Sequence, residues 1–385
     1  MPDKIIVYNP SSFGGTYDYI LQLLPSLRAL GVPVEIWMPS NAPTTVAEGR
    51  KHLLADRIEG GNIKKRFYFL WRSLISPLKF WTYIRTQPNA LVLFNDYDQI
   101  TIPFWVPLYK ATKAKGQVFA VELHDPDRDE FPPSLGYSQR TMLMLMDIMD
   151  IGIYHEILSD RLYYKQSHTR YASVPFGEYA MAPADSAMVQ QLVAARINPA
   201  DPSRPFVLAG INGNIRPEKN YDLAIKALPH HPDLKLIIAG RAANSGVDTN
   251  LYRNLATELG VADRIIWLER FLSDEELSAV LETTDIILLA YSASFKSQSA
   301  IFASLIPFSS NLVASEGENA MAKAVRNYNL GELVTPDDLE SLVEGIGRAK
   351  QYVGTKRPGW SAYKAANSWT KNAETIWGLA KETNQ

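Results

Sequence analysis

Two rounds of alternation between short apolar segments and helical stretches constrain the fold of this chain most. The first round has strand-like segments at Ile5–Tyr8, Val32–Met38, Leu91–Phe94, Val118–Leu123 and Ile151–Tyr154. The second round begins near Pro205 and has them at Phe206–Ile211, Leu234–Ala239, Arg264–Leu268, Asp285–Ala290 and Leu312–Ala314. Short apolar strands separated by helices are typical of parallel sheets covered on both faces. The pattern therefore predicts an α/β protein with two doubly wound, Rossmann-like domains.

The boundary between the two rounds is marked by Pro175, Gly177 and Pro183, which interrupt both patterns. A length of 385 residues also fits two domains better than one. Doubly wound sheets bind ligands at the carboxyl ends of their strands. Two such sheets facing each other would enclose a ligand cleft between them.

Composition excludes several classes of function. The net charge of −2 gives no general attraction to nucleic acid, and we expect no nucleic-acid partner. The absence of cysteine excludes thiol catalysis, disulfide scaffolds and Cys-ligated zinc. No apolar run of about 18 residues occurs, and the first residues resemble a strand more than a signal peptide. We therefore expect a cytoplasmic protein.

The sequence NGNIRPEKN, residues 212–220, places a glycine and two cations between a predicted strand and a helix. Gly213 permits close approach of the backbone, and the helix start offers amide groups to an anion. Arg216 and Lys219 would add positive charge, so a diphosphate is the expected ligand. The alternative is a solvated turn without a ligand. The motifs GxxxxGK[ST] and GxGxxG are absent.

Two further loops follow predicted strands of the first domain. SSFGGT, residues 11–16, carries Gly14 and Gly15 before a helix and is either a ligand loop or a tight turn. VELHDPDRDE, residues 121–130, carries His124, Asp125 and Asp127 at the end of a strand, where chemistry is common. Its spacing matches neither a calcium loop nor a zinc site, so we expect no metal. A mobile acidic loop without catalytic function is the alternative.

In their order and spacing, these segments make nearly the whole chain resemble the GT-B glycosyltransferases of family 4 (group 1). GNIRPEKN resembles the family's G-R-L-x-x-x-K-G, FGGT its glycine loop, LHDP its HD segment, and SVPFGEY its interdomain linker. DRIIWLERFLSDEELSAVLETTDIILLAY and the closing NSWTKNAETIWGLAKE also resemble family segments.

The resemblance implies a role for each segment. Residues 1–177 would bind the acceptor, completed by a C-terminal helix at 361–385, and residues 178–360 would bind a nucleoside-diphosphate sugar. Lys219 would hold the diphosphate, with Arg216 replacing the family arginine that is Asn214 here. Gly14, Gly15 and His124 would position the transferred sugar. The expected function is transfer of a sugar to a glycan or lipid-linked acceptor in cell-surface polysaccharide or glycolipid assembly.

The chain departs from the family at a pair of glutamates, whose positions fall on Lys296 and Ser304. Lys296, Ser297, Gln298 and Ser299 would offer a cation, hydroxyls and an amide to the donor instead. An inverting enzyme would need a carboxylate base, for which Asp125, Asp127 and Glu130 are candidates. A non-catalytic nucleotide-sugar-binding or scaffold protein of a polysaccharide assembly complex is the alternative function.

Residues 62–85, NIKKRFYFLWRSLISPLKFWTYIR, interleave basic and aromatic side chains. This composition suits an anionic membrane surface, which would place the protein at the inner face of the cytoplasmic membrane. Pro77 is expected to kink a helix there. Lys110, Lys113 and Lys115 would extend the basic surface. The alternative is a helix packed on the core with its cations reaching solvent.

Overall fold

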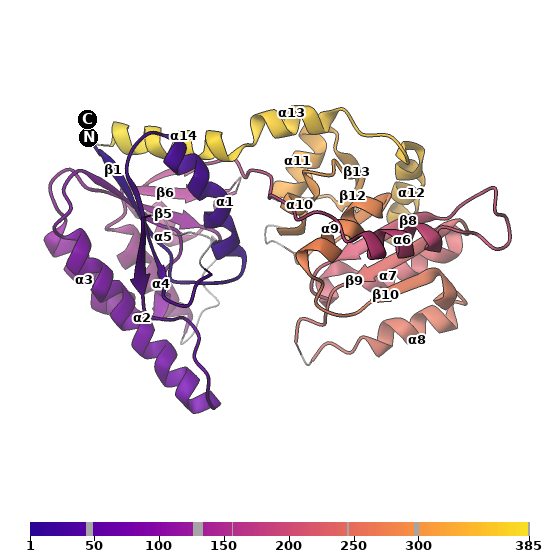
Figure 1. The fold of residues 1–385 in the computed structure, drawn as a ribbon, viewed down its shortest axis with the longest axis horizontal. Coiled ribbons are helices and arrows are strands. Elements are labelled where there is room, and N and C mark those ends of the chain that lie inside the picture. Colours follow the sequence, from indigo (N-terminus) through magenta and orange to yellow (C-terminus); the bar gives the residue numbers. More distant parts are fainter. Residues whose placement is uncertain (44–48, 126–133, 156, 245, 296–299, 384–385) are drawn as a thin grey trace. The chain divides into compact units, whose positions relative to one another are not determined.

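The computed structural model describes residues 1–43, 49–125, 134–155, 157–244, 246–295 and 300–383. The chain forms two compact units, and each contains one parallel sheet (Figure 1). Unit 1 comprises Met1–Gly177 and Asn367–Gln385, and unit 2 comprises Glu178–Ala366.

Unit 1 contains a 7-stranded sheet in the order β3-β2-β1-β4-β5-β6-β7. Its strands are β1 (Lys4–Tyr8), β2 (Val34–Pro39), β3 (Arg50–Leu53), β4 (Ala90–Phe94), β5 (Val118–Leu123), β6 (Ile151–Tyr154) and β7 (Arg170–Ser173). Every neighbouring pair is parallel, and Tyr8 of β1 lies opposite Phe94 of β4. The order of the strands reverses between β1 and β4.

Helices cover both faces of this sheet. The helices are α1 (Gly15–Ala29), α2 (Asn62–Ile84), α3 (Ile102–Thr112), α4 (Leu135–Met146), α5 (Leu162–Lys165) and α14 (Trp369–Glu382). One buried cluster joins the sheet to α1 and to α14, the last helix of the chain. The opposite cluster joins it to α2, α3, α4 and α5.

Unit 2 contains a 6-stranded parallel sheet in the order β10-β9-β8-β11-β12-β13. Its strands are β8 (Val207–Asn212), β9 (Leu234–Ala239), β10 (Ile265–Leu268), β11 (Ile286–Leu289), β12 (Leu312–Ser315) and β13 (Gly331–Val334). The order reverses between β8 and β11, where Gly210 pairs with Ile287.

The helices of unit 2 also lie on both faces of its sheet. They are α6 (Ser186–Ala195), α7 (Tyr221–Ala227), α8 (Asn250–Glu258), α9 (Asp274–Thr283), α10 (Ala300–Leu305), α11 (Ala320–Tyr328), α12 (Leu339–Ala349) and α13 (Gly359–Ala366). α7, α8 and α12 contribute to one buried cluster, and α6 and α9 contribute to another.

The prediction of two doubly wound parallel sheets is confirmed, but three edge strands were missed. β3 has the sequence RKHL, β7 has RYAS and β13 has GELV. Each lies at the edge of its sheet, where one side of the strand pairs with no other strand of the described residues and polar residues are tolerated. Such strands lack the apolar runs that identify the central ones.

α2 runs through Pro77 as one helix. Proline has no N–H for the carbonyl four residues earlier, which belongs to Ser73. The hydroxyl of Thr101 donates to that carbonyl at 2.6 Å and compensates for the missing bond. Among the residues that the structure describes, no helix has the length and apolarity that crossing a bilayer requires.

Candidate functional site at the strand-order reversals

Each sheet has a point where the strand order reverses, and the loops at the carboxyl ends of the strands diverge there. In open α/β sheets this is where ligands bind. In unit 2 the turn after β8 and the loop after β11 meet at this point. In unit 1 the loops after β1 and β4 do so.

The turns after β8 and β9 each require a glycine. Gly213 has φ +87°, and a side chain there would meet the Lys219 amine and Ile301 of α10. Gly240, which follows β9, has φ +142°, and a Cβ there would lie 2.1 Å from the Gly213 carbonyl oxygen. Close approach of the two backbones brings the turns after β8 and β9 into contact.

Lys219 folds back over the end of β8. Its Nζ donates to the Asn212 carbonyl at 2.5 Å, and its side chain is half-buried. Burial, and then the positive charge of Arg216, lower the pKa of Lys219 to about 8. Neither cation has an ion-pair partner within the part of the chain that the structure describes. Two neighbouring cations without a carboxylate form an environment that an anion would stabilise.

The helix start contributes less than the sequence predicted. Pro217–Lys219 form a 3-10 turn, and Asn220, in the left-handed conformation, precedes α7. The amides of Lys219 and Asn220 donate within this turn to Arg216 and Pro217, each at 3.1 Å. These two amides are therefore not available to an anion. Arg216 and Asn214 are both exposed.

The loop after β11 is fastened to this turn. The Ser292 amide donates to the Glu218 carbonyl at 2.8 Å, and the Ala293 amide donates to Asp337 at 3.0 Å. Asp337 also accepts from Asn220 at 2.9 Å. The predicted donor-site residues Lys296, Ser297, Gln298 and Ser299 continue this loop but lie outside the described residues.

In unit 1, Gly14 has φ +81° and Gly15 is already the first residue of α1. Asp56 holds the preceding loop, because it accepts from the Ser12 amide and the Ser12 hydroxyl, both at 2.7 Å. The guanidinium of Arg57 lies over the Phe13 ring. The glycine loop is thus anchored from the segment after β3.

Two asparagines occupy the strand-order reversal of unit 1. Asn9 follows β1 and Asn95 follows β4, and both are fully buried. Asn95 donates to the Asn9 side chain at 2.9 Å, and its own oxygen lies 3.4 Å from Nε2 of His124, the residue after β5. His124 is therefore at the ligand edge of the sheet, where the sequence placed it.

A second polar group lies beneath His124. The Tyr19 hydroxyl donates to Glu122 at 3.1 Å, and the Tyr19 ring packs edge-on against His124 with 4.7 Å between ring centroids. Glu122 also lies 3.7 Å from Nε2 of His155. Burial raises the pKa of Glu122 to about 8 and is the main cause that lowers the pKa of His155 to about 3. At neutral pH this is a protonated acid beside a neutral imidazole.

Of the three carboxylates predicted as candidates in the loop after β5, the structure describes one. Asp125 is exposed. Asp127 and Glu130 lie outside the described residues. Within the described ranges, no three His, Asp or Glu side chains lie close enough to hold a metal ion.

The sequence reading missed Asn9, Asn95, Glu122, His155 and Tyr19. Two signals were available. β1 and β4 both end in an aromatic residue followed by asparagine, YN and FN, and VFAVEL carries one carboxylate within an otherwise apolar strand. A lone ionisable residue in a fully buried strand needs a partner, and such residues cluster at functional sites.

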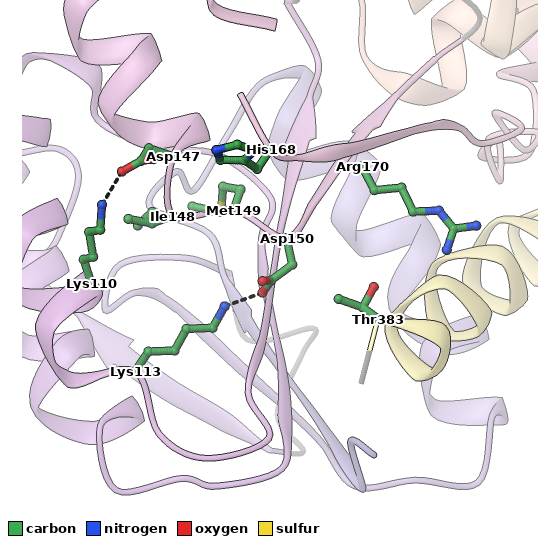
Figure 2. Close-up of a pocket in the computed structure, with 9 residues that line it drawn as sticks. All are labelled: Lys110, Lys113, Asp147, Ile148, Met149, Asp150, His168, Arg170 and Thr383. Carbon is green, nitrogen blue, oxygen red and sulfur yellow. Dashed lines mark hydrogen bonds and ion pairs between the residues drawn. The ribbon is translucent and has the colours of Figure 1, made fainter. Parts of the chain in front are cut away.

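A pocket with a volume of about 400 Å³ lies elsewhere on unit 1 (Figure 2). Its charged residues face one another in pairs: Lys110 with Asp147, Lys113 with Asp150, and Arg170 with Glu382 just beyond it. It lies at the amino ends of β6 and β7, the edge opposite to His124. Because its cations are already paired, it is not the candidate site, and Lys110 and Lys113 add little net charge to a basic surface.

Comparisons with known proteins agree with this architecture. Residues 203–357 match the family described as Glycosyl transferases group 1. The D-inositol 3-phosphate glycosyltransferase of Mycobacteroides abscessus is 28% identical over 170 residues, which are 43% of this chain but only 37% of that protein.

Two solved structures align over nearly the full chain. Sucrose-phosphate synthase from Thermosynechococcus elongatus has a TM-score of 0.70 at 15% identity, covering 99% of this chain and 98% of that one. HepE of Anabaena in complex with UDP-glucose has a TM-score of 0.64 at 15% identity, with the same coverage. The two doubly wound sheets and these alignments show that the chain has the GT-B fold. Residues 203–357, all within unit 2, are similar to the group 1 glycosyltransferases, as the motifs predicted.

Proposed function

We propose that this protein moves a sugar from a nucleoside-diphosphate sugar to a glycan or lipid-linked acceptor. The observation that carries the proposal is the position of Lys219 and Arg216 beside Gly213, at the strand-order reversal of unit 2. This turn lies within the residues that match the group 1 glycosyltransferases.

The chemistry of such a site is electrostatic. As the sugar leaves, negative charge develops on the departing diphosphate, and cations fixed nearby stabilise that charge more than the ground state. Lys219 is held in place by its bond to the Asn212 carbonyl, so little reorganisation is needed. A diphosphate between Lys219 and Arg216 would also relieve the repulsion that lowers the pKa of Lys219. Donor binding, leaving-group stabilisation and product affinity would thus involve the same two side chains.

Unit 1 supplies the groups proposed to hold the transferred sugar and the acceptor. The ligand edge of its sheet presents His124, with Asn95 and Tyr19 behind it. The glycine loop at Gly14 and Gly15 lies beside these groups, because Asn95 donates to the Thr16 carbonyl at 2.8 Å. Asp125, which is exposed at the same edge, is the carboxylate that we propose contacts an acceptor hydroxyl.

We further propose that the acceptor is presented at an anionic membrane. The first turns of α2 expose five large apolar side chains, between 40% and 79% accessible: Ile63, Phe67, Phe69, Leu70 and Trp71. Three cations, Lys64, Lys65 and Arg66, are exposed beside them, and no acidic residue occurs between Gly60 and Asn95. Figure 1 shows these turns extending beyond the sheet of unit 1. Exposed aromatics together with cations favour insertion at the surface of anionic lipid.

Arg72, the residue of α2 directly after these exposed turns, contacts the loops of the proposed acceptor site. Arg72 donates to the Pro10 carbonyl at 2.9 Å, in the loop after β1. It also lies 3.7 Å from Asp98, which follows β4. A membrane bound by α2 would therefore lie close to the loops of the strand-order reversal. A site at the inner face of the cytoplasmic membrane, in polysaccharide or glycolipid assembly, is consistent with this arrangement.

The decisive test is turnover with a panel of UDP-, GDP-, ADP- and TDP-sugars. Thermal shift identifies the donor that binds, and release of its nucleoside diphosphate with candidate glycan and lipid-linked acceptors measures transfer. Tight donor binding without turnover on any acceptor would favour the non-catalytic binding protein. Ser304, buried where the resemblance implies a glutamate, is the observation that keeps this second function open.

A further inference from the structure

The orientation of the Asn95 side chain is determined by its neighbours. Its Nδ2 donates to Oδ1 of Asn9 at 2.9 Å and to the Thr16 carbonyl at 2.8 Å. A primary amide has two N–H donors, so both are used by these bonds. The Thr16 carbonyl can only accept, which excludes the flipped amide. The Asn95 oxygen must therefore point to the remaining side, where Nε2 of His124 lies at 3.4 Å.

The orientation of the Asn9 side-chain amide is also determined by a backbone carbonyl. Nδ2 of Asn9 donates to the Ser11 carbonyl at 2.7 Å, so Oδ1 of Asn9 is the atom that faces Asn95. The hydrogen bonds therefore run in one direction: His124 donates to Asn95, Asn95 to Asn9, and Asn9 to Ser11. The carbonyls of Thr16 and Ser11 determine the direction of this series of hydrogen bonds, because a backbone carbonyl can accept a hydrogen bond but cannot donate one.

We propose that Asn95 is a positioning residue that fixes His124 in the Nε2–H tautomer and leaves the basic lone pair on Nδ1. An amide oxygen can only accept a hydrogen bond, so the His124 nitrogen that faces it must carry the proton. Tyr19 supports the same geometry, because its ring packs edge-on against the imidazole and restricts its rotation. Both asparagines are fully buried, so water does not compete for these bonds.

This tautomer decides which atom of His124 takes part in chemistry. Nε2 faces Asn95 as a donor, so a group that donates a hydrogen bond to His124 must do so at Nδ1. The choice of ligand rests on the proposed function, whereas the tautomer does not. The assignment therefore needs a test that requires neither donor nor acceptor.

Long-range ¹H–¹⁵N correlation spectra of the uniformly ¹⁵N-labelled protein provide that test, recorded where the imidazole is neutral. The chain has 6 histidines, and the signal of His124 is the one that is absent in His124→Gln. We expect a protonated Nε2 and an unprotonated Nδ1 in the wild-type protein. A protonated Nδ1, or two nitrogens averaged by exchange, would overturn the proposal.

Two variants distinguish the effect of the Asn95 acceptor on the tautomer from the effect of the surrounding packing. Asn95→Leu keeps a similar volume but removes the acceptor, and we expect the single tautomer to be lost. Tyr19→Phe keeps the ring beside His124 and should retain the Nε2–H tautomer. An unchanged tautomer in Asn95→Leu would remove Asn95 from this role. The wild-type spectrum decides the tautomer without either variant.

The outcome is independent of the proposed function. An Nε2–H tautomer in a protein that transfers no sugar would count against the glycosyltransferase proposal alone. An Nδ1–H tautomer in an active enzyme would count against the assignment of Asn95 alone.

Discussion

The side-chain amide of Asn372 donates a hydrogen bond to the Tyr19 hydroxyl at 2.9 Å and joins α14 to α1 across 353 residues of sequence. The same nitrogen donates to the Pro175 carbonyl at 2.8 Å. Tyr19 in turn donates to Glu122, so the last helix of the chain completes the polar group beneath His124. α14 is therefore part of the structure of the proposed acceptor site.

Replacing Asn372 by alanine should destabilise unit 1 by about 1–3 kcal/mol, because the buried Tyr19 hydroxyl and the partly buried Pro175 carbonyl lose their donor. Urea denaturation followed by tryptophan fluorescence measures the change. Glu374→Ala, an exposed position on the same helix, is the matched control and should have little effect. Equal midpoints for Asn372→Ala and the control would contradict this role of α14.

Glu122 should make the stability of unit 1 depend on pH between 6.5 and 8. Its pKa is raised by burial to about 8 in the folded protein, compared with 4.5 when exposed. The folded state therefore binds more protons than the unfolded state in this range, and stability falls as pH rises. The expected loss from pH 6.5 to 8 is about 2 kcal/mol. Glu122→Gln has no proton to lose, and its unfolding midpoint should not show this fall.

His155 has the opposite effect at lower pH. Its pKa of about 3 lies below the ordinary value of 6.5, so the unfolded state binds the extra proton. The contribution of His155 to the free energy of unfolding therefore rises as pH increases from 3 to 6.5. Between pH 4.5 and 6.5 this rise opposes the fall in the free energy of unfolding that Glu122 causes. Of these two groups only Glu122 contributes above pH 6.5, and comparison with Glu122→Gln separates its effect from that of other groups titrating there, such as Lys219. A wild-type profile that parallels that of Glu122→Gln above 6.5 would show that Glu122 is ionised in the folded protein.

Lys219→Ala should weaken nucleoside-diphosphate affinity by about 1.5–3 kcal/mol, the scale of a lost charged hydrogen bond. Isothermal titration calorimetry with the preferred nucleoside diphosphate measures it. Lys226→Ala is the matched control, because Lys226 on α7 is paired with Asp222 at 2.9 Å. If affinity does not change, Lys219 is not part of the site.

The same affinity should depend on pH through Lys219. Its pKa is about 8 in the free protein because of burial and Arg216, and a bound diphosphate would raise it. Affinity should therefore be constant near pH 7 and fall up to tenfold per unit above pH 8, as binding then requires uptake of a proton. The ligand phosphate, with a second pKa near 6, is already ionised there. Lys219→Arg stays charged and should show a flat profile over pH 7–9.5.

Replacing Phe67 and Trp71 with serine should reduce sedimentation with liposomes that contain phosphatidylglycerol, because it removes two exposed aromatics from α2. Phe271→Ser, an exposed aromatic of unit 2, is the control. Trp81 is unsuitable, since it is half-buried and its indole N–H donates to Thr112 at 2.8 Å. Failure of the wild-type protein to bind such liposomes would refute the membrane proposal.

The position of the cationic turn after β8 could be predicted from sequence because its determinants are local. Gly213, Arg216 and Lys219 lie within seven residues of one another, directly after an apolar strand. Parallel strands present their carboxyl ends at one edge, so His124 and the loop with Gly14 were also expected at a ligand edge. The alternation of strands and helices determined the two sheets in the same way, through local periodicity and burial.

The network beneath His124 could not be predicted in this way. Asn9 meets Asn95 only because β1 and β4 are neighbours in the sheet, and Asn372 meets Tyr19 only because α14 returns to the face covered by α1. The availability of the amides near Lys219 likewise depended on a 3-10 turn rather than a regular helix start. By itself the sequence determined the central strands, the helices that alternate with them and the polar loops, since these follow from spacing and propensity. Only the tertiary structure decided which polar side chains share a buried space, because strand order brings together residues that are far apart in the chain.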